Sequence, residues 1–139
     1  MKKIIQTWWM KLINWWYGRA YSMNPAIKKR WIEALRSGQY KQGQGYLKSG
    51  DKYCCLGVLC NLAKVDGVGK WECHMHATVF SCANSLDSRV LPRDVQQWAG
   101  IPNSVGVYEV NDDNDKTLVG LNDCGTSFEE IADVIDKKF

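Results

Sequence analysis

The chain has 139 residues, which is enough for one domain with its own core but not for two. Hydrophobic residues make up 45% and charged residues 24%, with 12 Gly and 3 Pro, which excludes a disordered or collagen-like chain. The net charge of +3 arises in residues 1–22, which carry four basic residues and no acidic ones. Of the 18 basic and 15 acidic residues in the chain, this leaves 14 basic and 15 acidic residues in residues 23–139. We therefore expect no nucleic-acid binding by this larger part of the chain.

Six cysteines would allow three disulfides in a secreted protein, but the sequence shows no clean signal peptide. The apolar residues 4–16 are interrupted by Gln6, Lys11 and Asn14, and no small-x-small cleavage site follows. We therefore expect reduced thiols and a cytoplasmic protein.

Residues 1–22 differ from the rest because they contain four of the seven tryptophans. Their polar positions Lys3, Thr7, Lys11 and Asn14 form one narrow stripe on an otherwise apolar helix. Three interpretations stay open. The helix packs on the domain or forms a homo-oligomer with a second copy, it lies on a membrane surface, or it is an extension ahead of a natural start at Met23. We place the domain boundary there, with residues 1–22 as an amphipathic segment and residues 23–139 as one compact domain.

Two helices are predicted in the first half of this domain. Asn24 as N-cap and Pro25 at the first helical position begin one helix, which ends at Ser37–Gly38. Its expected buried positions are Ile27, Trp31, Ala34 and Leu35. Residues 39–50 are too rich in glycine for a helix and indicate a loop or short strand. Asp51 is the expected cap of a second helix over about 52–64, in which Gly57 allows another element to approach closely.

The second half alternates between short elements. Residues 71–80 alternate as a strand, with Trp71, Cys73, Met75, Ala77 and Val79 on one face. A short helix follows Leu91–Pro92 and ends at Gly100, and residues 105–110 and 116–121 form a hairpin whose acidic tip contains Asp112, Asp113 and Asp115. A final helix is capped by either Thr126 or Ser127. Four helices with a small antiparallel sheet, in addition to the N-terminal helix, predict an α+β fold.

The chain resembles a family of small uncharacterised proteins encoded by bacteriophages and bacteria. The segments that carry this resemblance are WIEALRSGQYKQGQGYL, YCCLGVLCNLA, LPRDVQQWAGIP and GLNDCGTSFEEIADVID. The resemblance covers most of residues 23–139, but residues 1–22 lie outside it and residues 71–85 are poorly covered. It implies the cytoplasm of an infected bacterial cell as the setting and implies no established activity.

Two adjacent cysteines at the start of the second helix raise the question of catalysis. The positive end of a helix dipole lowers the pKa of a thiol and favours the thiolate. A papain-like arrangement would use Cys54 or Cys55 as nucleophile and His74 or His76 as base, with Asn122 or Asp123 as the orienting residue and Gln42 or Gln44 as an oxyanion donor. The alternative is a buried structural cysteine pair beside a solvated histidine strand.

A tetrahedral zinc site is a second hypothesis for the cysteines. Its ligands would be Cys73, His76 and Cys82, with Cys55, Cys60 or Cys124 as the fourth. No paired C-x-x-C knuckles support it, and the acidic tip lacks the central glycine and distal glutamate of an EF-hand loop. We therefore predict no metal site and no cofactor.

The stretch from Tyr40 to Tyr46 combines two rings, one cation and backbone accessible at two glycines, which suits contact with a phosphate or a base. Asn122 and Asp123 are expected at the same rim of the molecule. The predicted ligand-binding residues are Tyr40, Lys41, Gln42, Gln44, Tyr46, Asn122 and Asp123. We expect a non-enzymatic binding protein that engages a host protein or small molecule, such as a host-defence or signalling component. The alternative is a cysteine-dependent hydrolase.

Overall fold

The computed structural model describes residues 23–110 and 113–139, so the predicted segment 1–22 and Asp112 lie outside the described residues. Within them the chain forms five helices and three small sheets, which confirms the predicted α+β class. The helices are α2 (Pro25–Arg36), α3 (Cys55–Val65), α4 (Arg93–Ala99), α5 (Leu118–Asp123) and α6 (Phe128–Lys138). The strands are β1 (Lys41–Gln42), β2 (Lys48–Ser49), β3 (Lys52–Tyr53), β4 (Gly69–His74), β5 (Ala77–Cys82), β6 (Leu86–Asp87), β7 (Val107–Glu109) and β8 (Lys116–Thr117).

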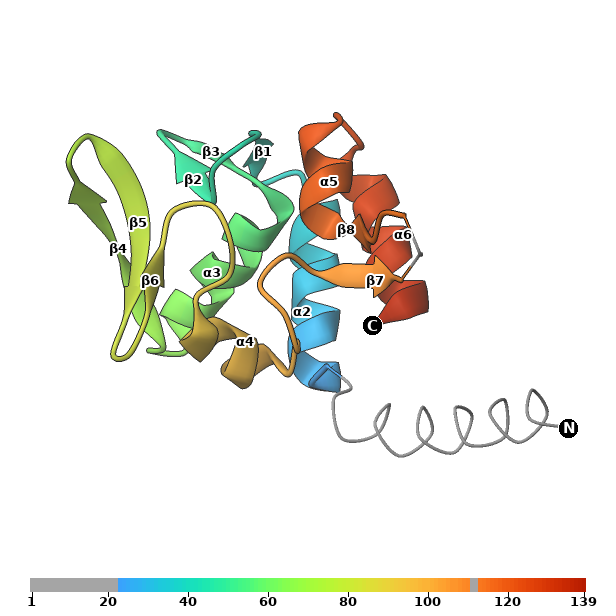
Figure 1. Ribbon diagram of the computed structural model, residues 1–139, viewed down its shortest axis with the longest axis horizontal. Helices are drawn as coiled ribbons and strands as arrows, with labels where there is room; N and C mark the ends of the chain where they lie inside the picture. Colours follow the sequence, from blue (N-terminus) through green and yellow to red (C-terminus); the bar gives the residue numbers. More distant parts are fainter. Residues whose placement is uncertain (1–22, 111–112) are drawn as a thin grey trace, which may run out of the picture.

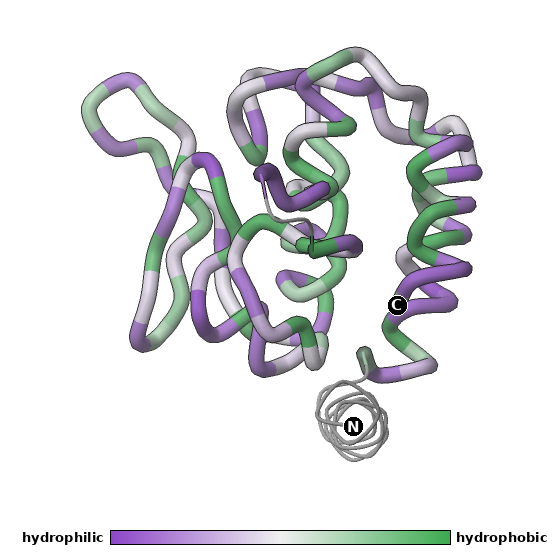
Figure 2. Tube along the Cα trace, turned by 45° about the vertical axis from the view of Figure 1, so that its right-hand side comes forward, coloured by the Kyte–Doolittle hydropathy of each residue, from purple (hydrophilic) through white to green (hydrophobic). Residues whose placement is uncertain are grey.

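Helix α3 lies at the centre of the molecule, between the β4–β5–β6 sheet on one side and helices α2 and α6 on the other (Figure 1). Seven consecutive residues of α3, from Cys55 to Leu59 together with Cys60 and later Ala63, are buried. Helices α2 and α6 each bury one stripe only, and their hydrophobic positions face the interior (Figure 2). None of the described helices is long and apolar enough to cross a membrane.

Helix α2 begins where the sequence predicts. The side chain of Asn24 accepts hydrogen bonds from the backbone N–H groups of Ala26 and Ile27, at 2.9 and 3.2 Å. The helix buries Trp31 completely, and the indole N–H donates to the carbonyl of Cys55 at 2.9 Å. Of the expected inward positions only Ala34 is half-buried, and Ile32 is buried in addition.

Helix α3 begins later than predicted, and Asp51 is not its cap. Residues 52 and 53 form β3, which pairs with β1 in parallel and with β2 in antiparallel orientation, so their backbone belongs to a sheet. The N-cap is Cys54, whose sulfur accepts from the N–H of Gly57 at 3.3 Å. Gly57 confirms the expected close approach, because a Cβ there would overlap the carbonyl oxygen of Leu47.

Residues 71–80 form two strands of a hairpin rather than one strand. Met75 and His76 are the turn, and both have positive φ angles, of 50° and 69°. This two-residue turn pairs Trp71 with Phe80 and Glu72 with Val79, so Val79 lies on the face opposite Trp71. The predicted single face is therefore wrong, because the turn reverses the alternation.

The C-terminal region also departs from the prediction at one point. Strands β7 and β8 form the expected hairpin, but residues 118–121 belong to helix α5 and not to a strand. Thr117 ends β8 and caps α5, since its hydroxyl accepts from the N–H of Gly120 at 2.9 Å. The cap of α6 is Ser127, which accepts from the N–H of Glu130 at 3.3 Å.

Candidate functional site

Asn122 joins the loop after α2 to the start of α3. Its side chain is completely buried at the end of α5. The carbonyl oxygen accepts from the side-chain amide of Gln42 at 3.0 Å and from the backbone N–H of Cys55 at 3.1 Å. The amide nitrogen donates to the carbonyl of Gly43 at 2.7 Å. Both ends of the Asn122 amide are thus satisfied by two segments more than 60 residues away in sequence.

We call residues 39–53 the anchored loop. A second contact to α5 holds its middle, because the carboxylate of Asp123 accepts from the N–H of Gly45 at 3.0 Å. An ion pair of 2.9 Å between Lys41 and Asp51 joins its two ends. The pKa of the Lys41 ammonium is raised and that of the Asp51 carboxyl is lowered, in both cases by the hydrogen bond between them. The expected juxtaposition of the 40–46 stretch with Asn122 and Asp123 is therefore present in the structure.

A row of aromatic rings flanks the anchored loop. Tyr40 meets Tyr53 edge to face with ring centroids 5.1 Å apart, and Tyr53 meets Trp71 at 6.0 Å. Trp71 in turn contacts the buried ring of Phe80 at 4.9 Å. Such edge-to-face pairs are favourable because the positive edge of one ring faces the negative face of another. The row runs from the loop to the core of the β4–β5–β6 sheet.

Polar groups fix this row at both sides. The side chain of Asn61 on α3 donates to the Tyr40 hydroxyl at 2.9 Å and accepts from the Trp71 indole at 3.1 Å. The ammonium of Lys48 lies 5.3 Å from the Tyr53 ring centroid and 5.4 Å from that of Trp71. Both distances are within the range of a cation–π interaction. A half-buried cation over two rings is a surface that suits an anionic or planar group.

Tyr46 and Arg89 form a second pair of ring and cation. The guanidinium of Arg89 lies 5.0 Å from the Tyr46 ring centroid, and it donates to the Tyr46 hydroxyl at 3.3 Å. The Tyr46 side chain is 40% exposed, although the adjacent Leu47 is completely buried. The loop therefore presents Tyr46 to solvent from a rigid base, with Gln44 also exposed beside it.

The cysteines of α3 are buried among apolar residues. Burial raises the pKa of the Cys54 thiol to about 11, and it also raises the pKa of Cys55 well above its ordinary value. The N–H groups at the helix start act in the opposite direction, but their effect is smaller. The expected lowering of the thiol pKa is therefore wrong, because desolvation outweighs the helix terminus. Cys55 donates from its sulfur to the carbonyl of Leu118 at 3.6 Å.

The two histidines lie at the far end of the β4–β5 hairpin. His74 contacts the carboxylate of Glu72 at 2.7 Å, and this hydrogen bond lowers the pKa of Glu72. His76 occupies the turn, next to Met75, which is 97% exposed. Among the described residues no hydrogen bond joins either histidine to Cys54. Asn122 and Gln42 contact each other and the loop, so the residues of the papain-like hypothesis are divided between two places.

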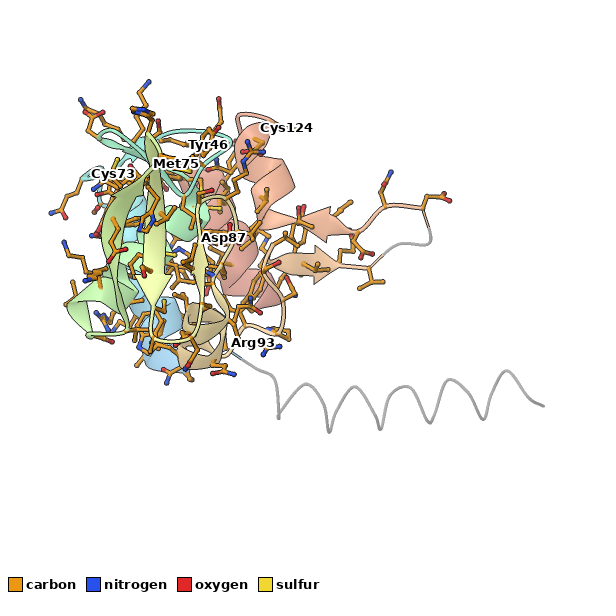
Figure 3. All side chains as sticks on the ribbon, turned by 60° about the vertical axis from the view of Figure 1, so that its left-hand side comes forward. Tyr46, Cys73, Met75, Asp87, Arg93 and Cys124 are labelled. Atoms are coloured by element: carbon orange, nitrogen blue, oxygen red, sulfur yellow. The ribbon has the colours of Figure 1, made fainter. Side chains whose placement is uncertain are left out.

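The residues of the zinc hypothesis are also separated. Cys73 pairs with Thr78 near the turn of the hairpin, whereas Cys82 lies opposite Gly69 at its other end. Figure 3 shows Cys73 on this hairpin and Cys124 on α5. Cys55 and Cys60 are completely buried in α3. Over the described ranges, no three His, Cys, Asp or Glu side chains form a group that could hold a metal ion.

Sequence reasoning missed several residues that shape this site. They are Lys48, Tyr53, Asn61, Trp71 and Arg89. They come from four separate parts of the chain, so no local pattern joins them. The alternation of charged and aromatic residues over 46–53 was the one available signal, because it is typical of short strands with one covered face.

The comparisons with known proteins place the chain in an uncharacterised family. The chain belongs to the family described as a domain of unknown function, DUF8296, whose model matches residues 23–139. The match begins at Met23, where the composition of the sequence changes. No curated protein and no solved structure was found to match the chain.

Proposed function

We propose that the protein is a non-catalytic binding module, and that the anchored loop is its binding surface. The observation that carries this proposal is the buried Asn122 amide, which holds the loop against α3 and α5 through three hydrogen bonds. A loop fixed in this way loses little conformational entropy when a ligand binds. Rigid scaffolds that display loop side chains are typical of binding sites.

The chemistry of the surface favours a ligand with an anionic group beside a planar one. Arg89 and Lys48 supply positive charge next to the rings of Tyr46 and Tyr53. A phosphate would accept hydrogen bonds from either cation, and a base or aromatic side chain would stack on an exposed ring. A host nucleotide, or a host protein segment with an acidic and an aromatic residue, has this chemistry.

The burial of the α3 thiols supports a binding role over cysteine-dependent hydrolysis. A nucleophilic cysteine requires thiolate character and access to substrate. Cys54 is 5% exposed and Cys55 is 0% exposed, and burial raises the pKa of both thiols. The neighbours of both sulfur atoms are backbone groups, which explains the cysteines through the fold.

The proposed biological setting follows from the family resemblance. We infer that the protein is a phage-type accessory protein that acts in the cytoplasm of a bacterial host, where its ligand is a host-defence or signalling component. Residues 1–22 would add self-association or contact with a membrane surface. Both parts of this setting are tested separately from the loop.

The loop is tested by nuclear magnetic resonance titration of the full chain with adenosine triphosphate and with inorganic phosphate. We expect chemical-shift changes confined to residues 40–53 and Arg89. Tyr46→Ala should weaken nucleotide binding by about 5- to 150-fold if a base stacks on the ring. Tyr46→Phe keeps the ring and removes only the hydroxyl, so it should bind within a few-fold of the wild type.

A matched control is Val65→Ala, because Val65 is 72% exposed at the end of α3. The same variants should be used to capture ligands from a bacterial lysate. The proposal predicts that molecules retained by the wild type and by Val65→Ala are lost with Tyr46→Ala. Identical retention by all three proteins, together with no shift changes at the loop, would refute the proposed surface.

A further inference from the structure

The β4–β5–β6 sheet has one free edge, which is formed by β4. The strand order is β4–β5–β6, so β4 is hydrogen-bonded to a strand on one side only. β4 lies at the outer side of the sheet in the views of Figures 1 and 3. An edge strand presents unpaired N–H and C=O groups that can pair with another chain.

The register identifies the groups that point outward. In a hairpin with a two-residue turn the closing pair, His74 and Ala77, is hydrogen-bonded, and hydrogen-bonded pairs then alternate with non-bonded ones. Cys82 is in a non-bonded pair with Gly69, and its N–H points away from β4 and donates to Ser85 at 2.7 Å. The same alternation turns the backbone of Gly69 toward the free edge.

Trp71 and Cys73 are in non-bonded pairs as well, so three residues of β4 present backbone groups at the edge. In the part of the chain that the structure describes, the backbone groups of Gly69, Trp71 and Cys73 make no hydrogen bond outside the sheet. The Trp71 ring does not block the edge, because its indole is held by Asn61 on the inner face.

The solvent face of β4 carries charges of opposite sign on either side of Trp71. Lys70 and Glu72 point to the same face and are 3.1 Å apart at their charged atoms. If two β4 strands pair antiparallel about a two-fold axis at Trp71, Lys70 of each copy lies directly opposite Glu72 of the other. Charges of one sign at both positions would repel a second copy, whereas this arrangement is self-complementary.

The same register brings Cys73 opposite Gly69 of the second copy. Glycine has no side chain, so the pair does not crowd the inner face, where a Cβ on Gly69 would already meet Phe80. Three outward residues in each strand can form six backbone hydrogen bonds. An unrelated peptide could use the same backbone groups, but the alternating charges favour a second copy of this chain.

We propose that the protein forms a two-fold dimer through antiparallel pairing of β4 with β4, with Trp71 opposite Trp71. The two small sheets then form one continuous sheet of six strands. The dimer leaves the anchored loop in each copy tied to α5, and it is independent of the proposed function of that loop.

Charge-reversal variants of the full chain test the proposal, with native mass spectrometry as the measurement. Lys70→Glu and Glu72→Lys should each weaken self-association by about 5- to 30-fold, because like charges face each other twice. Mixing the two single variants should restore a dimer that contains one copy of each. The double variant, Lys70→Glu with Glu72→Lys, should dimerise like the wild type.

The mixture separates this pairing from other effects of the substitutions. Restored contacts within one chain cannot produce a mixed dimer from two variants that are monomeric alone. Any association through residues 1–22 is common to all the proteins. Equal association in every sample, or a mixture no more associated than its components, would overturn the proposal.

A second measurement does not depend on charge. Cys73→Pro removes one outward N–H at a position where an edge strand accepts proline, so it should abolish the dimer. In the wild type, the amides of Trp71 and Cys73 should exchange hydrogen more slowly as protein concentration rises, with Glu72 as the control already bonded to β5. Exchange at Trp71 and Cys73 that is independent of concentration would also overturn the proposal.

Discussion

Replacing Asn122 by alanine is expected to destabilise the fold substantially. The change removes three hydrogen bonds, to Gln42, Gly43 and Cys55, from a site with no solvent exposure. A typical bond contributes about 1 kcal/mol, and a buried group left without a partner costs about 1–3 kcal/mol. The Cys55 N–H is at the start of a buried helix, and water has little access to replace its partner.

We therefore expect Asn122→Ala to lower the free energy of unfolding by about 3–5 kcal/mol. That is a large share of the roughly 5–15 kcal/mol that stabilises a domain of this size. Urea denaturation followed by tryptophan fluorescence measures the change, because Trp31 and Trp71 are packed in the folded state. The neighbouring Asp123→Ala is the matched control, since it loses one exposed hydrogen bond and should cost about 0.5–1.5 kcal/mol.

A loss below about 1 kcal/mol for Asn122→Ala would refute this reasoning, because it would show that the loop is not held through this amide. Asn122→Asp gives a further test. It keeps the acceptor but loses the donor to Gly43 and places an acidic group in a buried site, so it should also be destabilising. Its cost should decrease at low pH, where the carboxyl group is protonated.

Three other predictions follow from the structure. Cys54 should stay unreactive toward an alkylating reagent at neutral pH and react only as the pH approaches its raised pKa of about 11, and rapid labelling well below pH 8 would contradict this. Ser127→Ala should cost about 1 kcal/mol in thermal unfolding and Thr126→Ala less, because Ser127 is the cap, and equal effects would remove this assignment. Deletion of residues 1–22 should leave residues 23–139 folded while it changes oligomer mass in light scattering or lipid binding in vesicle flotation. Failure of the truncated chain to fold would place the segment in the core.

The sequence predicted those parts of the fold that local chemistry determines. The start of α2 follows from Asn24 and Pro25, whose cap geometry needs no distant partner. The buried stripe of α6 follows from its spacing. The start of α3 did not follow, because Lys52 and Tyr53 pair with strands that no local signal identifies.

The hairpin shows a second limit of local reasoning. A strand and a two-residue turn differ by the sign of φ at two residues, and Met75 and His76 are not residues that favour positive φ. Without Gly or Asn at the turn, the alternation of 71–80 was indistinguishable from one strand. The contact of Asn122 with the loop was predictable only as a common rim, since its partners are set by tertiary packing.

The choice of cysteine as the cap of α3 has a physical explanation that involves no catalysis. Serine and threonine cap helices better in water, but Cys54 is 5% exposed, and a hydroxyl there would need a partner for its O–H as well as for its oxygen. A thiol is a weak donor and behaves as a small apolar group, so leaving its S–H unpaired costs little, while its sulfur still accepts from Gly57. The helix start must be dry, because Leu47 of the anchored loop closes over Gly57. The adjacent cysteines are thus a consequence of packing the loop onto α3, and the exposed side chains of that loop are where a ligand can act.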